Sequence, residues 1–269
     1  MRRAGRWIAG IYLGAFLVFM LAPLFFIVVN SFNDAVYSVF PPDGVSPRWY
    51  YHLLEREEFL FALRNSAMIA VVVCGLALTL GMGVALAIVR GRWARREIVQ
   101  SLFLTPLLVP RIVIGVAALM MAIQVSLYPS FTSTILAHTV LVLPYAVSIL
   151  VASLLQVDRV QEEAATDLGA NGWLTFRLAT LPQIFRGALV AAIFTFIVSF
   201  DEFDIALFLS RSDNMTLPVR MYLYMQEQEN PTMAAMSTLL ITITALLVIV
   251  IMQVTRGVNL LSLLGKRGG

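Results

Sequence analysis

The chain has 269 residues, of which 59% are hydrophobic and 13% charged, and its mean hydropathy is +0.85. A soluble domain carries about 25% charged residues, so this shortage of charge excludes an ordinary water-soluble domain and points to lipid as the solvent. The formal net charge of +3 is small, and we expect no nucleic acid among the partners.

Six apolar runs are each long enough to cross a bilayer as a helix, which needs about 20 apolar residues. Their length and their lack of a two-residue alternation favour helices over strands. The first run lacks a convincing cleavage site, so we expect a retained helix and not a cleaved signal peptide. We therefore predict an all-α polytopic membrane protein with six transmembrane helices in one domain, residues 1–269. The runs lie at 7–29, 63–89, 98–124, 133–155, 187–210 and 234–255.

The basic residues indicate how the spans are oriented. An even number of spans places both termini on one side of the membrane. Thirteen basic residues lie in segments on that side, five lie in the opposite connections, and Arg111 lies within a span. Because Lys and Arg favour cytoplasmic segments, we expect both termini to be cytoplasmic. The thirteen are Arg2, Arg3, Arg6, Arg90, Arg92, Arg95, Arg96, Arg159, Arg177, Arg186, Arg256, Lys266 and Arg267.

The cytoplasmic connection between the fourth and fifth spans is more patterned than a passive link requires. Asp158 is placed to cap a helix, with Gln161 three residues later to complete the cap. Ala164 and Ala165 are strong helix formers that present almost no side chain. Gly169 can adopt the left-handed conformation that ends a helix. These residues predict a short helix along the membrane surface.

A second short helical pattern follows in the same connection. Asn171 and Gly172 turn the chain, Trp173 begins the pattern, and Pro182 is expected to stop or bend it before the fifth span. Two interpretations stay open on the residues alone. The connection is either a helix–turn–helix that another protein backbone approaches closely, or a solvated amphipathic loop.

A sequence motif in this connection resembles the EAA loop of ABC importer permeases. The family pattern is Glu-Ala-Ala, three residues, Gly, nine residues and Ile-x-Leu-Pro, and here only the Ile departs, being Ala179. The position between the fourth and fifth of six spans and the cytoplasmic side also agree. The resemblance implies that residues 157–186, called the coupling loop below, dock on a separate ATPase subunit. The coupling residues implied are Glu163, Ala164, Ala165, Gly169, Leu181 and Pro182.

The likeness extends over nearly the whole chain to the spermidine/putrescine branch of these permeases. It rests on PLFFIVVNSFN (23–33), SFDEFDIALFLS (199–210), TLPVRMYLYM (216–225) and NPTMAAMSTLLI (230–241). The resemblance implies a type I importer permease fold, a bacterial inner-membrane location, a second permease subunit and an external substrate-binding protein. It also implies a dimeric ATPase that carries ATP and magnesium. The sequence has no GxxxxGK[ST] loop, so we expect this chain to be non-catalytic and to hold no cofactor.

Charged residues are predicted deep in the membrane. Arg111 lies about 13 residues and Asp201 about 14 residues from the cytoplasmic ends of their spans, or about 20 Å deep at 1.5 Å per residue. Such groups face protein or water, because lipid exposure is costly. We expect Asp201 and Asp204 to share a helix face and Glu202 to meet another helix. The prolines at 106 and 110 are expected to bend the third span.

The residues leave the role of these charges open. Asp201, Glu202, Asp204, Arg111 and Tyr145 form the predicted translocation path. Either Asp201 and Asp204 line a cavity for a cationic solute, or Arg111 pairs with one of them as a structural ion pair. A free guanidinium in the path would instead suit a zwitterion or an anion such as a phosphonate.

Other functions account for fewer of these features. A proton-coupled secondary transporter would explain the membrane-embedded acids but not the coupling loop. An intramembrane enzyme lacks a recognisable catalytic arrangement. With two separated histidines, His52 and His138, and no cysteine cluster, we expect no metal site.

Overall fold

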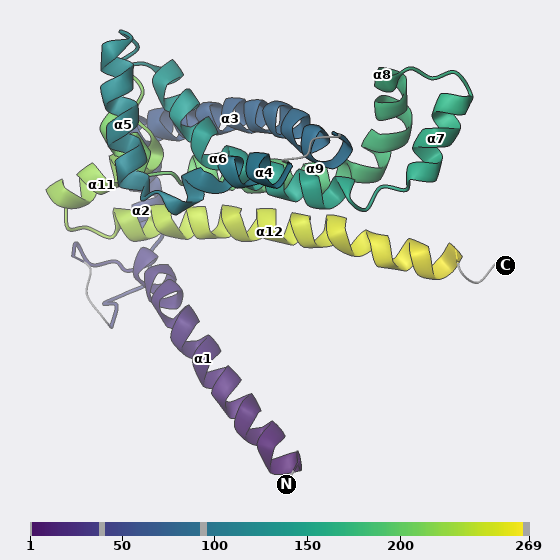
Figure 1. The fold of residues 1–269 in the computed structure, drawn as a ribbon. Helices are drawn as coiled ribbons and strands as arrows, with labels where there is room; N and C mark the ends of the chain where they lie inside the picture. Colours follow the sequence, from purple (N-terminus) through teal and green to yellow (C-terminus); the bar gives the residue numbers. More distant parts are fainter. Residues whose placement is uncertain (1, 38–40, 92–95, 266–269) are drawn as a thin grey trace. The chain divides into compact units, whose positions relative to one another are not determined.

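The computed structural model describes residues 2–37, 41–91 and 96–265, which are almost entirely helical (Figure 1). Within these ranges the one extended pairing is an isolated bridge between Asn33 and Val45. The predicted all-α class is confirmed. Of the basic residues behind the predicted orientation, Arg92, Arg95, Lys266 and Arg267 lie outside the described residues. In chain order the elements are α1 (Arg2–Ser31), α2 (Arg48–Leu54), α3 (Glu57–Arg90), α4 (Arg96–Leu104), the 3₁₀ helix η1 (Thr105–Leu108), α5 (Arg111–Gln124), α6 (Phe131–Leu154), α7 (Arg159–Asp167), α8 (Gly172–Thr175), the π-helix η2 (Phe176–Thr180), α9 (Leu181–Phe200), α10 (Asp204–Leu209), α11 (Leu217–Glu227) and α12 (Thr232–Gly265).

The six predicted spans all have counterparts in the described part of the chain. Five helices are long and apolar enough to cross a bilayer alone, and the bent pair Glu97–Leu108 and Arg111–Gln124 makes a sixth crossing if its two helices count as one span. This pair is bent by 97°, so the predicted bend in the third span is confirmed. Its cause is Pro110, which has no N–H to donate and holds Val109 in an extended conformation at φ −90° and ψ 131°. The five are Gly10–Ser31, Glu57–Arg90, Phe131–Leu154, Gly172–Phe200 and Thr232–Val250.

The fifth span is broken near its outer end, so the prediction of one continuous run over 187–210 is wrong there. Helix α9 ends at Phe200, and α10 begins at Asp204 after three non-helical residues. In an unbroken helix the Ile205 N–H would bond to the carbonyl of residue 201. Here the carboxylate of Glu202 accepts that N–H at 3.0 Å, which replaces the helical hydrogen bond.

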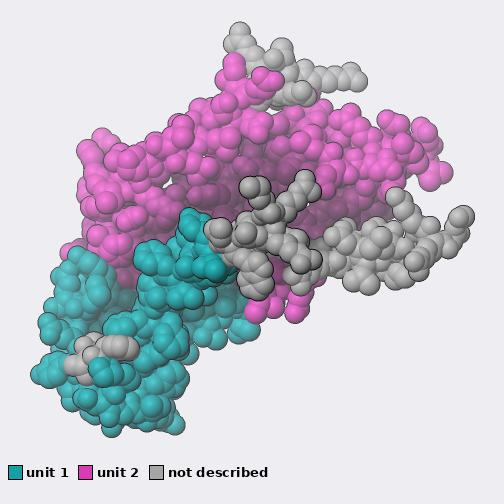
Figure 2. Space-filling model, turned by 90° about the horizontal axis from the view of Figure 1, so that it is seen from below, with its two compact units in different colours: residues 1–60, 221–246 teal, residues 61–220, 247–269 magenta. Residues whose placement is uncertain are grey.

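The chain divides into two compact units (Figure 2). The first contains residues 1–60 and 221–246, and the second contains residues 61–220 and 247–269. The single permease domain predicted over residues 1–269 stays a prediction.

Aromatic contacts organise the first unit. The indole of Trp49 is 4% exposed, and its N–H donates to the carbonyl of Asn33 at 2.8 Å. Phe59 packs edge-on against Tyr224 with the ring centres 5.2 Å apart. Residues 10–26 of α1 are all exposed, so these side chains are available to lipid or to another protein, whereas Asn30 and Ser31 at its end are buried.

Helix α6 is the most buried span of the second unit and packs against α9, α5 and α10. Small residues allow its neighbours to approach. A Cβ added to Gly187 of α9 would overlap Ser153 Oγ, and one added to Gly81 of α3 would lie 3.1 Å from the Cβ of Ala146. Such small-residue crossings are typical of packing between membrane helices, where backbones must come close.

Candidate functional site

The first helix of the coupling loop begins as predicted at Asp158. Its carboxylate accepts the Val160 N–H at 3.0 Å, which caps α7. The second half of the predicted cap is wrong, because Gln161 does not complete it. The backbone N–H of Asp158 instead donates to Gln183 Oε1 of α9 at 3.1 Å. The cap therefore joins the start of α7 to the start of the fifth span.

Gly169 ends α7 in the left-handed conformation, as predicted, with φ +88°. Its N–H donates to the Thr166 carbonyl at 2.9 Å, and the Ala170 N–H donates to the Ala165 carbonyl at 3.0 Å. This pair of bonds is the Schellman motif, which satisfies the last carbonyls of a helix and requires a positive φ at the glycine position. The motif fixes the sharp turn between α7 and α8, which lie side by side in Figure 1.

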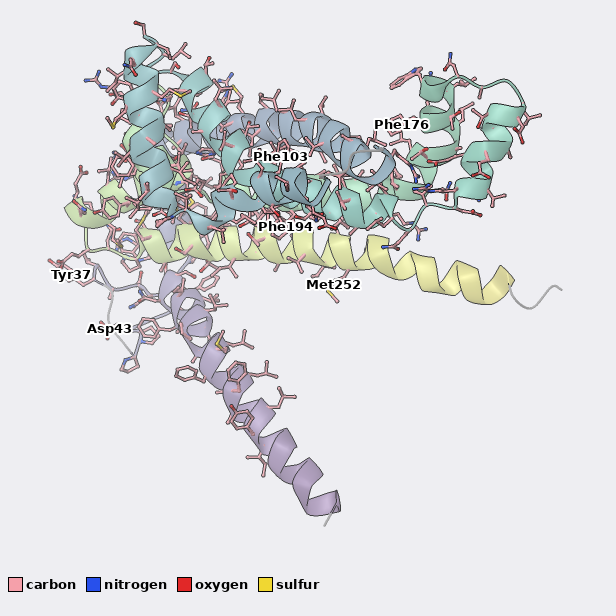
Figure 3. The ribbon with its side chains drawn as sticks, in the orientation of Figure 1. Tyr37, Asp43, Phe103, Phe176, Phe194 and Met252 are labelled. Carbon is pink, nitrogen blue, oxygen red and sulfur yellow. The ribbon has the colours of Figure 1, made fainter. Side chains whose placement is uncertain are left out.

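The second half of the loop runs directly into the fifth span. Asn171 caps α8 by accepting the Leu174 N–H at 2.9 Å. Pro182 was expected to stop or bend the helix. It does not stop it, because Gly172–Phe200 is one continuous helical run, but the ribbon changes direction between α8 and α9 (Figure 1). The five-residue π-helix η2 immediately precedes the proline, and its wider turn accommodates the missing N–H. Phe176 of η2 packs against the hydrophobic core of the second unit (Figure 3).

Glu162 links the coupling loop to two spans, a contact that the sequence interpretation missed. Its Oε1 accepts from Arg90 Nη2 at the end of α3 at 2.8 Å and from the Thr180 hydroxyl at 2.6 Å. The carboxylate side chain is 17% exposed and the guanidinium side chain 24% exposed. We call these three side chains the Glu162 clamp. Nothing in the sequence signals it, because Arg90 lies 72 positions away.

The outer surface of the coupling loop carries exposed apolar side chains. Leu168 is 90% exposed, Trp173 69%, Val160 67% and Leu178 65%. Exposed large apolar groups in one short segment are typical of a surface that another protein covers. The predicted coupling residues share this accessible segment: Glu163, Ala164, Gly169 and Pro182 are exposed, and Ala165 and Leu181 are half-buried.

The charged residues of the predicted translocation path lie at two helix breaks. Arg111 is the first residue of α5, directly after Pro110, and Glu202 lies between α9 and α10. Arg111 Nη1 donates to Glu202 Oε2 at 3.2 Å. The arginine side chain is 46% exposed and the glutamate side chain is fully buried. Glu202 thus meets another helix, as predicted, and it is the acid that pairs with Arg111. The alternative in which Arg111 pairs with Asp201 or Asp204 is therefore wrong, because its ion pair is with Glu202.

Asp201 and Asp204 do not share a helix face. Asp201 caps the C-terminal end of α9, and Asp204 begins α10. The break between them arises because Glu202 takes the Ile205 N–H. Asp201 is exposed and Asp204 is half-buried. Their carboxylates therefore remain accessible beside an ion pair that is already formed.

Gly115 allows the two breaks to approach each other, and the sequence interpretation missed it. A Cβ at this position would lie 3.1 Å from Ile205 Cα and 3.2 Å from the Asp204 carbonyl oxygen. Both neighbours are backbone atoms of α10. Only glycine lets α5 pack this closely, and so Gly115 helps to place Arg111 beside Glu202. An isolated glycine in an apolar run was the only signal available.

Tyr145 lies apart from the charged group. Its ring packs against Phe194 of α9, labelled in Figure 3, with the centroids 5.2 Å apart. In the described part of the chain it forms no hydrogen bond to the three carboxylates. His138, also on α6, is fully buried, and its Nδ1 lies 3.1 Å from Ser199 Oγ just before the break. Both contacts hold α6 against α9.

Comparison with known proteins agrees with this fold. A family model described as "Binding-protein-dependent transport system inner membrane component" matches residues 75–259. The spermidine/putrescine transport system permease protein PotC of Escherichia coli (strain K12) is 25% identical over 252 residues, covering 94% of this chain and 95% of that protein. The putrescine transport system permease protein PotI of the same strain is 30% identical over 231 residues, covering 83% and 82%.

A solved structure of a bacterial ABC transporter involved in the import of the acidic polysaccharide alginate matches with a TM-score of 0.69. It covers 95% of this chain and 96% of that chain at 14% sequence identity, which shows a shared fold. The family model spans well over half of the chain. The chain therefore belongs to the family of inner-membrane components of binding-protein-dependent transport systems, and it is a multi-pass ABC importer permease resembling the polyamine permeases.

Proposed function

We propose that this chain is the transmembrane permease subunit of an ATP-driven importer for polyamines or a related small polar amine or zwitterion. The names of two relatives, PotC and PotI, support the solute class. The charge of the broken-helix region supports it independently.

The ion pair between Arg111 and Glu202 is the observation that carries the proposal. The pair neutralises the positive charge of Arg111, which would otherwise repel a cation, because the guanidinium is bonded to the fully buried carboxylate of Glu202. Asp201 and Asp204 are left beside the pair, so the four side chains carry two net negative charges when all are ionised. In a site of low dielectric such a surplus attracts an ammonium group strongly.

The same pairing and the coupling loop disfavour the two alternatives. An anionic solute such as a phosphonate would need the Arg111 guanidinium, which Glu202 already engages. A proton-coupled secondary transporter would use the accessible acids Asp201 and Asp204, but it gives no role to the exposed apolar side chains of the coupling loop.

The proposed complex contains a second permease, a dimeric ATPase that binds ATP and magnesium, and an external substrate-binding protein. The exposed apolar side chains of the coupling loop support docking of the ATPase. In this arrangement ATP hydrolysis takes place on the partner, and the chain described here forms part of the solute path without catalysing a reaction.

The test is ATP-driven uptake of putrescine into liposomes that contain the complete importer, with the binding protein at saturation. Replacing Asp201 or Asp204 by Asn removes one charged hydrogen-bond acceptor, which is worth about 1.5–3 kcal/mol. We therefore expect the maximal uptake rate to fall about tenfold in each variant. Asp213→Asn, at an exposed position outside the site, is the matched control and should transport normally.

Three results would contradict the proposal. Full uptake by both Asp201→Asn and Asp204→Asn would remove the cation-binding role. A preference for an anionic solute would reverse the predicted charge selectivity. Uptake by the isolated chain without ATP would instead support a secondary transporter.

A further inference from the structure

A cavity of about 500 Å³ lies between the last turns of α6 and the first turns of α9. It is separate from the broken-helix region and from the apolar surface of the coupling loop. Its polar lining consists of Ser148, Ser153, Gln156, Gln183 and Arg186. The lining contains no acidic side chain, and the Ser148 and Ser153 hydroxyls already donate to backbone carbonyls of α6. The cavity therefore offers the positive charge of Arg186 and the amide groups of Gln156 and Gln183.

Arg186 is the charged group of this cavity. It is half-buried, and in the described part of the chain its guanidinium has neither a hydrogen bond nor an ion pair. Arg90 and Arg111 of the same unit are by contrast paired with Glu162 and Glu202. A half-buried guanidinium without a protein partner is suited to an anion, above all to the oxygens of a phosphate.

The side-chain amide of Gln183 lines the same cavity and can add a hydrogen bond to the anion. Gln183 Oε1 accepts the Asp158 N–H at 3.1 Å, and its Nε2 donates to the Ala179 carbonyl at 2.8 Å. Among the described residues the Gln183 oxygen accepts this one bond, and its second amide hydrogen has no acceptor. Gln183 therefore adds a donor beside Arg186.

The cavity also changes polarity along its length. Gln156 lies just before the coupling loop and Gln183 near its end, whereas Ile149 and Val190 lie about two helical turns deeper in their spans. Ser148 lies beside Ile149, but its hydroxyl already donates to the Pro144 carbonyl at 2.8 Å. The polar end is on the side predicted to be cytoplasmic. We propose that this cavity binds an anionic phospholipid of the cytoplasmic leaflet, with its phosphate on Arg186 and its glycerol and acyl portion against the deeper apolar residues.

The experiment measures lipid bound to the complete importer. Purified complex in nanodiscs of phosphatidylcholine with increasing phosphatidylglycerol is analysed by native mass spectrometry. One arginine near an anionic membrane surface contributes about 1 kcal/mol of binding free energy. Arg186→Gln should therefore weaken phosphatidylglycerol retention about fivefold. Arg186→Lys keeps the charge and should retain most of the binding. Arg177→Gln, an exposed arginine outside the cavity, should bind like the unchanged protein.

Several outcomes would overturn the inference. Equal retention of phosphatidylglycerol by Arg186→Gln would show that the arginine does not hold the lipid. Absence of retained lipid from the unchanged complex would show that something else fills the cavity. Arg186-dependent binding of inorganic phosphate without any preference for phosphatidylglycerol would assign the site to a soluble anion. Because the readout is lipid mass, it does not depend on the proposed solute.

Discussion

At position 202 one carboxylate has two partners, and each has a structural consequence. Oε1 accepts the Ile205 N–H, which starts α10 and ends the fifth span early, while Oε2 accepts from Arg111 at the start of α5. An unpaired charge left in such a buried place costs about 3–5 kcal/mol. The pair therefore holds two broken helices together, and in the proposed importer it sets the charge that a solute meets.

Gly115 provides a test of that junction at the level of one atom. Gly115→Ala places a Cβ 3.1 Å from Ile205 Cα and 3.2 Å from the Asp204 carbonyl, and backbone atoms cannot rotate away as a side chain would. We expect the substitution to destabilise the importer by about 1–3 kcal/mol and to lower putrescine uptake, because α10 must shift.

The control for this substitution is Gly75→Ala on α3, where an added Cβ meets nothing within 4 Å. It should be neutral or slightly stabilising, since alanine is the better helix former. The measurements are thermal unfolding of the purified complex and uptake into liposomes. Equal unfolding temperatures for the two alanine variants would show that the close contact at Gly115 carries no strain.

Among the elements, α7 is tied to the membrane helices chiefly by the Glu162 clamp and by the cap that Asp158 shares with Gln183. Glu162→Gln removes the charge from both clamp bonds, so we expect the α7 junction to weaken by about 1–3 kcal/mol. Movement of α7 should then reach α3 and α9 less completely. The expected result is more ATP hydrolysed per putrescine transported, with the chain still inserted in the membrane.

A double-mutant cycle identifies the clamp as the cause. Arg90→Gln should raise the same ratio, and the Glu162→Gln and Arg90→Gln pair should cost less than the sum of the single changes. Asp167→Asn, an exposed acid at the end of the same helix, should leave the ratio unchanged. Additive effects of the clamp substitutions would mean that the two residues act independently.

The elements could be predicted from the sequence to different degrees. Long apolar runs fix the spans, and local chemistry fixes the helix cap at Asp158 and the left-handed turn at Gly169. Local rules fail where a distant or competing group takes a hydrogen bond, as at Glu202 and Gln183. They also do not reveal the π-helix before Pro182, through which the chain stays helical at a residue that usually ends helices.

On the scale of the whole molecule, the second unit combines two regions of different character. The broken-helix region brings charge inside the spans, where it is costly unless paired or used. The coupling loop brings apolar side chains to the end of the unit, where Leu168 is 90% exposed. The fully helical α9 joins the two, because it starts at the loop and ends at Phe200 beside the acids. In the proposed importer this continuity makes α9 the mechanical path between the ATPase and the solute.

Charge reversal on the loop tests that path in the assembled importer. Glu163 is exposed on α7, and its side chain forms no hydrogen bond or ion pair within the described part of the chain, so Glu163→Lys should leave insertion intact. At an ATPase interface the reversed charge should weaken docking by several kcal/mol through like-charge or unpaired contacts. We expect less ATPase to co-purify with the permease and ATP-driven uptake to fall in parallel. Glu97→Lys, an exposed reversal on α4 outside the coupling loop, should change neither. Normal co-purification and coupled uptake with Glu163→Lys would mean that the ATPase grips another part of the chain, and the role proposed for α9 would fail with it.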